Sequence, residues 1–305
     1  MYKVLIATTS FSKISVRHKK ELSRLNIEII LNPHNRKLRK KELIEILNDE
    51  KLIAVIAGTE TYDKEVLNLS YLKFISRLGS GISNIDFATS KKLRIKLTSK
   101  PKLTATPVAE LALGALILLL RNLDHSNENL KNYNWIRSDG YSLENKKVLI
   151  IGFGRVGRKL ASLLKSFNVR ILVFDPLVKK LNTHYQKVTL KKGIKTADII
   201  SIHVNTESQI LGKNEFKIMK KNMILLNSSR GAVVSENDLI KALKSGVVSR
   251  VWLDVFKNEP YYGKLIKHDQ AFLTPHIGSY TSESRKKMEN ECLEEIINFV
   301  KKIKV

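Results

Sequence analysis

The stretch that decides the fold is Lys147–Gly157, which reads KVLIIGFGRVG. It is an apolar run that breaks into G-x-G-x-x-G, and the residues after it continue with helical spacing. This order predicts a buried strand, a tight turn and the start of a helix. In such a turn Gly152 permits the bend, Gly154 lets a pyrophosphate approach the backbone, and Gly157 lets the helix pack closely on the strand. The stretch therefore predicts a dinucleotide-binding unit.

A second strand-like run, Val169–Phe174, ends at Asp175, which follows Gly157 by 18 residues. An acid near this position accepts hydrogen bonds from a ribose 2′-hydroxyl and repels a 2′-phosphate. We therefore expect NAD, in preference to NADP, as the cofactor. A glycine-rich turn in some other α/β protein is the alternative, and the strand, helix and acid around the motif argue against it.

The bulk composition suits a two-domain protein of a reducing compartment. The chain has 305 residues, of which 43% are hydrophobic, and this is enough to bury two cores. Its single cysteine, Cys292, excludes an intramolecular disulfide. The N-terminus runs straight into a strand-like segment and lacks the long apolar core of a signal peptide. We expect a cytoplasmic protein.

The formal net charge of +25 raises the question of a polyanionic partner. The basic residues are spread in short pairs, no aromatic side chains interleave with a basic stripe, and no nucleic-acid motif is present. The longest apolar stretch, Val108–Leu120, is too short for a membrane span and predicts a buried helix, with Thr106 and Pro107 as its cap and first turn. We expect neither a nucleic acid nor a membrane as a partner.

Strand-like and helix-like segments alternate from end to end, which predicts parallel sheets covered by helices on both faces. The division between two α/β blocks falls near residue 100. Thr281–Ile303 has the apolar spacing of one helix face, on which Cys292 lies as a core residue. The expected strands of the first block, with a helix such as Lys41–Leu47 between them, are Val4–Thr8, Ile27–Leu31, Leu52–Ile56 and Phe74–Arg77. Those of the second block are Lys147–Ile151, Ile171–Phe174, Ile199–His203, Met223–Asn227, Val251–Asp254 and Phe272–Thr274.

Three segments after predicted strands carry side chains suited to chemistry on an acidic substrate. Arg230 lies in Asn-Ser-Ser-Arg-Gly, Glu259 in Asp-Val-Phe-Lys-Asn-Glu-Pro, and His276 in Thr-Pro-His-Ile-Gly. Ligands of open α/β sheets bind at this carboxyl edge of the strands. Hydride transfer to or from a carbonyl needs a proton donor or acceptor near neutral pH, which histidine supplies, and the planar fork of arginine matches a carboxylate. A carboxylate beside the histidine would orient it and favour its charged form.

At these residues the chain resembles the D-isomer-specific 2-hydroxyacid dehydrogenases, on the phosphoglycerate dehydrogenase side of that family, over essentially its whole length. The resemblance implies that Arg230, Glu259 and His276 are catalytic. It implies that the backbone N–H groups of Ser80 and Gly81 bind the substrate together with Arg230 and His276, and it implies no metal. The implied cofactor contacts, with Asp254 holding the nicotinamide carboxamide, are Gly152, Gly154, Arg155, Val156, Gly157, Asp175, His203, Ser229, Asp254 and Gly278.

The family fold implies an α/β protein in which a Rossmann dinucleotide-binding domain is inserted into a flavodoxin-like α/β substrate domain. The expected substrate-binding domain is 1–100 plus 284–305, and the expected NAD-binding domain is 101–283. The C-terminal helix should return to the first block. Dimerisation in the family usually runs through the cofactor domain, so the resemblance implies a homodimer.

The resemblance implies an NAD-dependent oxidoreductase that acts on a small D-2-hydroxy acid or its 2-oxo partner. The first candidate substrate is 3-phosphoglycerate, because Asn32–Leu38 resembles the same stretch of phosphoglycerate-type members. The phosphate would need a cation besides Arg230, and Arg36, Lys37 and Arg77 are the candidates. The alternatives are a glyoxylate or hydroxypyruvate reductase and, in a different class, an NAD(H)-sensing co-regulator with the same fold.

Three departures from the family pattern bear on this reading. Thr104 stands where the family often has asparagine, and His203–Ser208 is shorter than the matching stretch of many relatives, which predicts a trimmed wall over the adenosine. The length of 305 residues leaves no room for the C-terminal regulatory domains of some phosphoglycerate dehydrogenases, so feedback through such a domain is not expected.

Overall fold

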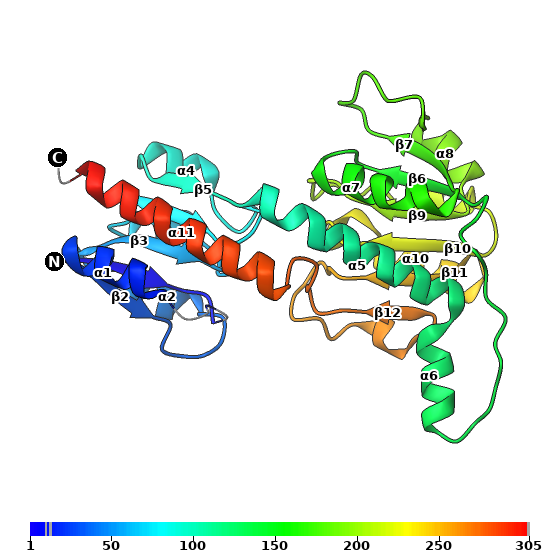
Figure 1. The fold of residues 1–305 in the computed structure, drawn as a ribbon, viewed down its shortest axis with the longest axis horizontal. Coiled ribbons are helices and arrows are strands. Elements are labelled where there is room, and N and C mark those ends of the chain that lie inside the picture. The colour runs from blue at the N-terminus through cyan, green and yellow to red at the C-terminus, as the bar shows by residue number, and fades with distance from the viewer. Residues whose placement is uncertain (10, 12–13, 304–305) are drawn as a thin grey trace. The chain divides into compact units, whose positions relative to one another are not determined.

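The computed structural model describes residues 1–9, 11 and 14–303 of the chain. The chain divides into two units, one of Met1–Thr104 with Ser279–Val305 and one of Ala105–Gly278 (Figure 1). The second unit is thus an insertion in the first. The sequence predicts these boundaries near residues 100 and 284.

The first unit is a five-stranded sheet in the order β2-β1-β3-β4-β5, and all neighbouring strands are parallel. This order is that of the flavodoxin-like doubly wound fold. Its strands are β1 (Tyr2–Ile6), β2 (Ile27–Leu31), β3 (Leu52–Ala57), β4 (Phe74–Arg77) and β5 (Lys96–Thr98). Its helices are α1 (Val16–Arg24), α2 (Lys40–Leu47), α3 (Lys64–Asn68), α4 (Phe87–Lys92) and α11 (Ser282–Ile303).

Both faces of this sheet are covered, because successive side chains of a strand point to opposite faces. Along β1, Val4 and Ile6 belong to the core layer that contains Cys292 of α11. Leu5 between them belongs to the layer on the other face, with α2. Burial raises the pKa of the Cys292 thiol to about 11, so this side chain is an un-ionised core residue.

A buried charge pair joins α11 to the sheet of the first unit. Lys100 Nζ donates to Glu295 Oε2 at 2.7 Å, and the lysine side chain is fully buried. Ser76 and Thr98 donate hydroxyl hydrogen bonds to the same carboxylate oxygen, at 2.8 and 2.6 Å. A buried ammonium is tolerated only when paired and hydrogen-bonded in this way. The C-terminal helix therefore returns to the first unit.

The second unit is a seven-stranded parallel sheet in the order β12-β11-β10-β9-β6-β7-β8. The order reverses between β6 and β9, and in open α/β sheets ligands bind beyond the carboxyl ends of the strands at such a point. The strands are β6 (Lys147–Ile151), β7 (Arg170–Phe174), β8 (Tyr185–Lys187), β9 (Ile199–Ile202), β10 (Met223–Asn227), β11 (Val248–Leu253) and β12 (Ala271–Leu273). The helices are α5 (Pro101–Arg121, which begins in the first unit), α6 (Leu123–Lys131), α7 (Arg155–Leu164), α8 (Leu190–Thr196), α9 (Lys213–Lys217) and α10 (Glu236–Lys244).

The apolar runs predicted as strands overlap strands of the structure, which confirms the α/β fold of Rossmann and flavodoxin-like type. Two strands, β5 and β8, are absent from the expectation. Both have three residues and lie at a sheet edge, with residues that are exposed or only partly buried. An edge strand of this kind lacks the continuous apolar run by which buried strands are recognised.

Helix α5 begins at Pro101, so the expected cap at Thr106 and Pro107 is wrong. Pro107 lies inside the helix. A proline there has no N–H for the carbonyl four residues earlier, which is that of Leu103. Ser284 Oγ donates to this Leu103 carbonyl at 2.8 Å instead. A partner this distant in sequence cannot be read from the local pattern.

The expectation that this apolar segment is too short for a membrane is also wrong on length. α5 has 21 residues and, by length and composition alone, is long and apolar enough to cross a membrane. A core helix passes the same test. Ala109, Ala112 and Leu116 of α5 are buried in one core layer with Val148 and Ile150 of β6. One face of α5 therefore packs in the core of the second unit.

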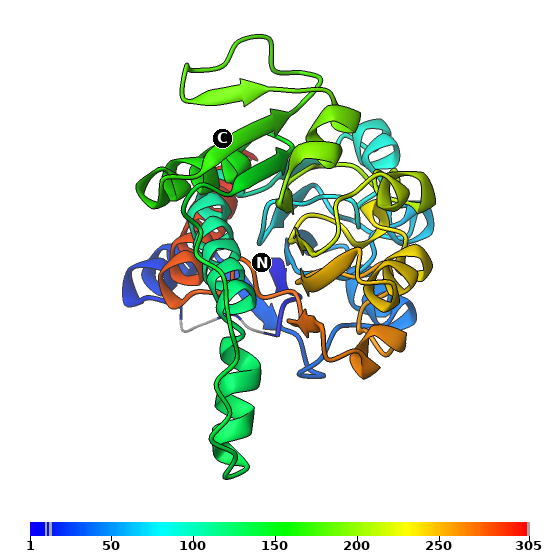
Figure 2. The ribbon, with the colours of Figure 1, turned by 90° about the vertical axis from the view of Figure 1, so that its right-hand side faces the viewer.

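Helix α6 and the segment after it extend away from the rest of the second unit (Figure 2). Asn122, between α5 and α6, has a left-handed backbone with φ of 48°. The buried Arg250 of β11 ties this corner down, since its guanidinium donates to Asn122 Oδ1 at 2.8 Å and to Asp124 Oδ2 at 2.5 Å. Large side chains on this extension are exposed: Leu123, Leu130, Tyr133, Trp135, Ile136 and Tyr141.

Candidate active site

The three glycines after β6 have three different physical roles. Gly152 has φ of +89°, and a Cβ there would lie 2.5 Å from the carbonyl oxygen of His203. A Cβ on Gly157 would lie 2.2 Å from the carbonyl oxygen of Gly152. A Cβ on Gly154 would meet nothing within 4 Å. Two glycines are thus required by the protein's own packing, while Gly154 borders open space.

That open space lies at the N-terminus of α7, for which Gly154 is the N-cap. Arg155 and Val156 form the first turn of the helix. Backbone N–H groups and the helix dipole at such an end favour an anion, and the missing Cβ lets it approach. The residues therefore fit the pyrophosphate of NAD.

Asp175 lies beside this glycine loop, at the end of β7. Its Oδ2 accepts the backbone N–H of Phe153 at 2.7 Å, and its Oδ1 accepts that of Leu177 at 2.8 Å. A carboxylate has about four lone-pair sites, so two remain for ribose hydroxyls. Asp175 therefore both orders the loop and keeps the capacity expected of a ribose ligand.

His203 follows β9 and faces the same loop through its carbonyl oxygen. Its Nε2 lies 2.8 Å from Ser201 Oγ. Burial lowers the pKa of His203 to about 4, so the imidazole is neutral at neutral pH. A neutral histidine adds no charge to a cofactor site.

Asp254, at the end of β11, is almost fully buried and anchors the loop that carries His276. It accepts hydrogen bonds from Thr274 Oγ1 at 2.6 Å and from the backbone N–H groups of Ile277 and Gly278 at 2.8 and 2.7 Å. Burial raises the pKa of Asp254, and these hydrogen bonds oppose that shift. The sequence did not predict this anchoring role of Asp254. Its contact with the nicotinamide carboxamide remains a prediction.

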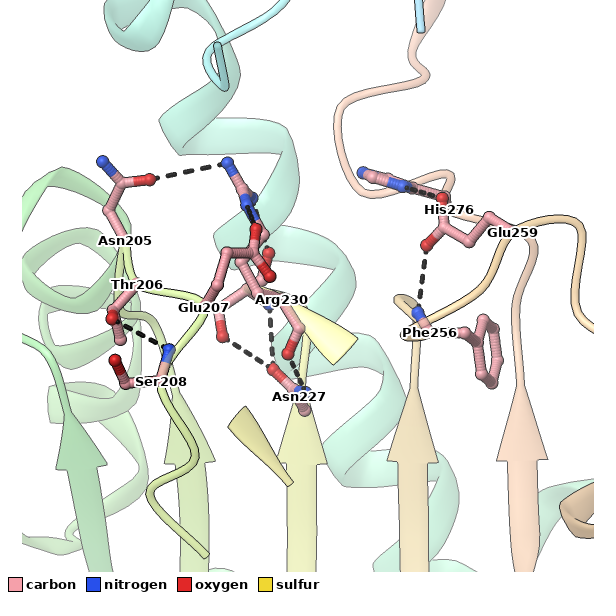
Figure 3. Close-up of polar contacts among 10 residues, drawn as sticks. Asn205, Thr206, Glu207, Ser208, Asn227, Arg230, Phe256, Glu259 and His276 are labelled. Carbon is pink, nitrogen blue, oxygen red and sulfur yellow. Dashed lines mark hydrogen bonds and ion pairs between the residues drawn. The ribbon is translucent and has the colours of Figure 1, made fainter. Parts of the chain in front are cut away.

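His276 and Glu259 form a direct pair (Figure 3). His276 Nδ1 lies 2.8 Å from Glu259 Oε2, and Glu259 Oε1 accepts the backbone N–H of Phe256 at 3.0 Å. The histidine side chain is half exposed, at 50%, and its backbone has φ of 54°. With Nδ1 engaged by the carboxylate, Nε2 is the nitrogen that can exchange a proton with a substrate.

Arg230 follows β10 in a turn that Asn227 holds in place. Asn227 Nδ2 donates to the Arg230 carbonyl at 2.9 Å, and its Oδ1 accepts both the N–H and the hydroxyl of Ser229. A Cβ on Gly231 would lie 2.0 Å from the Phe256 carbonyl carbon, so only glycine fits after the arginine. Ser229 and Arg230 are therefore set by close packing between neighbouring strand ends.

The guanidinium of Arg230 contacts three acceptors. Its Nη1 donates to the Ser229 carbonyl at 2.6 Å, its Nη2 reaches Asn205 Oδ1 at 3.5 Å, and its Nε lies 3.3 Å from Glu207 Oε1. Sequence reasoning did not single out Asn205 or Glu207. Their position just after β9, at the same carboxyl edge as Arg230, is the signal that could have identified them.

The second unit thus brings most predicted site residues to one sheet edge. Arg230 and the His276–Glu259 pair lie above neighbouring strand ends in Figure 3. Ser80 and Gly81 belong to the other unit, in the loop after β4, where Gly79 accepts the backbone N–H of Lys100 at 2.7 Å. Their substrate contact remains a prediction. Among residues 1–9, 11 and 14–303, no group of three or more histidines, cysteines or acids could hold a metal.

Comparisons with known proteins agree with this geometry. The sequence model of the D-isomer-specific 2-hydroxyacid dehydrogenase NAD-binding domain matches residues 113–278, which lie in the second unit. The chain is 36% identical over 262 residues to glyoxylate reductase of Thermococcus litoralis, a match that covers 80% of this chain and 78% of that one. It is 33% identical over 259 residues to D-3-phosphoglycerate dehydrogenase of Methanocaldococcus jannaschii, covering 82% of this chain and 49% of that one.

A solved structure gives the same result for the fold. The crystal structure of a glyoxylate reductase from Paecilomyes thermophila superposes with a TM-score of 0.86 at 25% identity, and the match covers 98% of this chain and 95% of that one. The glycine loop, the strand-end side chains and these matches have one explanation. The chain belongs to the D-isomer-specific 2-hydroxyacid dehydrogenase family and is an NAD-dependent oxidoreductase.

Proposed function

We propose that this enzyme reduces a small, unphosphorylated 2-oxo acid, such as glyoxylate or hydroxypyruvate, with NADH. The observation that carries the proposal is the pairing of Arg36, the first candidate for a phosphate contact. Its Nη1 and Nη2 donate to the two carboxylate oxygens of Glu42 at 2.8 and 2.6 Å. A bidentate pair of this kind engages one whole edge of the guanidinium.

The Arg36–Glu42 pair persists at neutral pH. The hydrogen bonds from Arg36 and from the backbone N–H of Arg39 lower the pKa of Glu42 to about 2, so this carboxylate is ionised. Of the other candidates, Arg77 donates from Nη1 to the Leu78 carbonyl, and Lys37 is exposed. A substrate phosphate at Arg36 would have to displace two short hydrogen bonds, which supports an unphosphorylated substrate.

The relatives support the same substrate class. A glyoxylate reductase and a hydroxypyruvate reductase are among the relatives that this chain matches at 30% identity or more. The chain is 36% identical to the glyoxylate reductase of Thermococcus litoralis and 33% identical to the phosphoglycerate dehydrogenase of Methanocaldococcus jannaschii.

The side chains supply the chemistry of the reduction around a cofactor that contributes the hydride when bound at the glycine loop. Arg230 holds the substrate carboxylate and polarises the C2 oxygen. Protonated His276, oriented by Glu259, would give its proton to that oxygen. In the oxidation direction neutral His276 takes the hydroxyl proton. The 2.8 Å pair and the position of Arg230 at the same sheet edge support these roles.

Oxidation of D-3-phosphoglycerate is the second candidate function. The exposed Lys37 beside Arg36 favours it, as does the similarity to the phosphoglycerate dehydrogenase of Methanocaldococcus jannaschii. We also propose that the enzyme acts in the cytoplasm, since its one cysteine is a buried thiol suited to a reducing compartment.

Steady-state kinetics at 340 nm test the proposal. With NADH, we expect a higher kcat/KM for glyoxylate or hydroxypyruvate than for phosphohydroxypyruvate. The variant Arg36→Ala should change these constants little. A preference of the wild-type enzyme for phosphohydroxypyruvate would overturn the proposal. If Arg36→Ala raises the KM for phosphohydroxypyruvate but not that for glyoxylate, the phosphoglycerate assignment is favoured.

A further inference from the structure

The short segment after β9 places a carboxylate directly on Arg230 (Figure 3). Glu207 Oε1 lies 3.3 Å from Arg230 Nε, and Asn205 Oδ1 lies 3.5 Å from its Nη2. The hydroxyl of Thr206 accepts the backbone N–H of Ser208 at 3.1 Å, which orders the turn that carries Glu207. The segment His203–Ser208, which is shorter than in many relatives, therefore places a carboxylate beside Arg230.

The contacts of Arg230 differ in strength, and the difference separates a fixed contact from an exchangeable one. Its hydrogen bond to the Ser229 carbonyl is short, at 2.6 Å, and belongs to the turn itself. The contacts to Glu207 and Asn205 are longer and come from a neighbouring loop. The Glu207 side chain is 58% exposed, while that of Arg230 is 22% exposed. An ion pair with a solvated partner contributes little to stability, so an incoming carboxylate can replace it.

We propose that Glu207 is a specificity-determining residue of the reduction. Its carboxylate is the counter-ion of Arg230 until the substrate carboxylate displaces it, and it disfavours substrates that carry a second negative charge. This inference rests on the proposed function only in assigning the substrate carboxylate to Arg230.

Charge balance gives the physical reason. One substrate carboxylate replaces one Glu207 carboxylate on the guanidinium, so the net charge of that contact is unchanged. The displaced Glu207 remains nearby, because the ordered turn tethers it. A second carboxylate or a phosphate on the substrate would then lie near an unpaired anion, and like charges at short range repel.

A bracing role for Glu207 is the competing explanation, and it makes a different kinetic prediction. If Glu207 only holds Arg230 in place, its removal should lower kcat and weaken all substrates alike. If it competes with the substrate, its removal should lower KM and leave kcat nearly unchanged. Uniform binding changes affect KM alone, which makes the split between the two constants diagnostic.

The experiment compares oxamate with oxalate, two inhibitors of nearly equal size that carry one and two negative charges. Their dissociation constants are measured on the enzyme–NADH complex by NADH fluorescence, so the readout does not depend on turnover. The variant is Glu207→Gln, with Glu207→Asp retaining the charge. Glu291→Gln, on the exposed face of α11, removes the same charge far along the chain as a matched control.

We expect Glu207→Gln to tighten oxalate relative to oxamate by about three- to tenfold, the effect of one half-exposed charge at short range. Glu207→Asp and Glu291→Gln should retain the wild-type ratio, and kcat with glyoxylate should stay within about twofold for Glu207→Gln. An unchanged ratio in Glu207→Gln would overturn the inference even if the wild-type enzyme reduces glyoxylate. A wild-type preference for phosphohydroxypyruvate would overturn the proposed function, while a shifted ratio would still support the role of Glu207.

Discussion

The Glu259 carboxylate connects the backbone at the end of β11 with the imidazole of His276. One oxygen accepts the Phe256 N–H at 3.0 Å and the other lies 2.8 Å from His276 Nδ1. A carboxylate held at both ends can orient the ring without itself changing position. This geometry supports the prediction that His276, whose side chain is half exposed, exchanges a proton with the substrate through Nε2.

Replacing His276 tests this assignment. His276→Ala should lower kcat by about 10²–10⁴-fold, which is the usual contribution of one general acid–base group. Glu259→Gln keeps the shape of the side chain and removes its charge, so it should give a smaller loss. The dissociation constant of NADH, measured by fluorescence, should remain close to that of the wild-type enzyme. Near-normal turnover of His276→Ala would exclude its catalytic role.

Arg230 should be replaceable by neither alanine nor lysine. Arg230→Ala should raise KM for the 2-oxo acid and lower kcat, because both carboxylate binding and polarisation of the C2 oxygen are lost. Arg230→Lys should restore only part of kcat/KM, since a point charge cannot reproduce a planar fork of donors. The measurement is steady-state kinetics with glyoxylate. Full recovery in Arg230→Lys would mean that only the charge matters.

Asp175 should determine the preference for NADH over NADPH. Asp175→Ala should lower kcat/KM with NADH relative to kcat/KM with NADPH, because repulsion of the 2′-phosphate of NADPH is lost. The KM for NADH should also rise in Asp175→Ala, since the carboxylate holds the N–H groups of Phe153 and Leu177. Asp269→Asn, at an exposed position, is the control. Equal efficiency of the wild-type enzyme with both cofactors would contradict the assignment.

His203 should make the stability of the protein depend on pH in the acid range. Its pKa is lowered by burial from 6.5 to about 4, so between these values the unfolded state binds more protons than the folded state. The stability contribution is therefore complete above about pH 6.5 and is lost as the pH falls toward 4.

Between pH 7 and pH 4, the urea concentration at the unfolding midpoint should fall less for His203→Gln than for the wild-type protein. His184→Gln, at an exposed position, should follow the wild-type curve. A wild-type slope retained in His203→Gln would show that other groups dominate the acid range.

The extension formed by α6 and the segment after it should mediate a homodimer. The resemblance to the family implies association through the NAD-binding domain, and Tyr133 and Trp135 on this extension are 97% and 78% exposed. Burial of such side chains stabilises association. Light scattering coupled to size-exclusion chromatography should give a dimer for the wild-type protein and a monomer for the double variant Trp135→Ser with Ile136→Asp. Tyr71→Ser, an exposed aromatic of the first unit, should remain dimeric, and a monomeric wild-type protein would refute the prediction.

Local steric rules made much of the second unit readable from the sequence. A Cβ on Gly157 would lie 2.2 Å from the carbonyl oxygen of Gly152 within the same motif, so the motif alone predicts the turn and the helix after it. The alternation of Leu149 and Ile150 between two core layers likewise follows from the pleat of one strand. The resemblance to the family then predicted the pairing partner of His276.

Other features depended on side-chain contacts, which local patterns do not encode. The early start of α5 depends on Ser284, whose hydroxyl satisfies the carbonyl of Leu103. The engagement of Arg36 by Glu42 and of Arg230 by Glu207 depends on how side chains point once the backbone is in place.

The sequence by itself therefore determined the cofactor loop, the order of the elements and the residue types available for hydride chemistry, because each of these follows from short-range backbone geometry and strand periodicity. Only the tertiary structure decided which cations already have an anionic partner, because ion pairs form between side chains that folding brings within a few ångströms of each other.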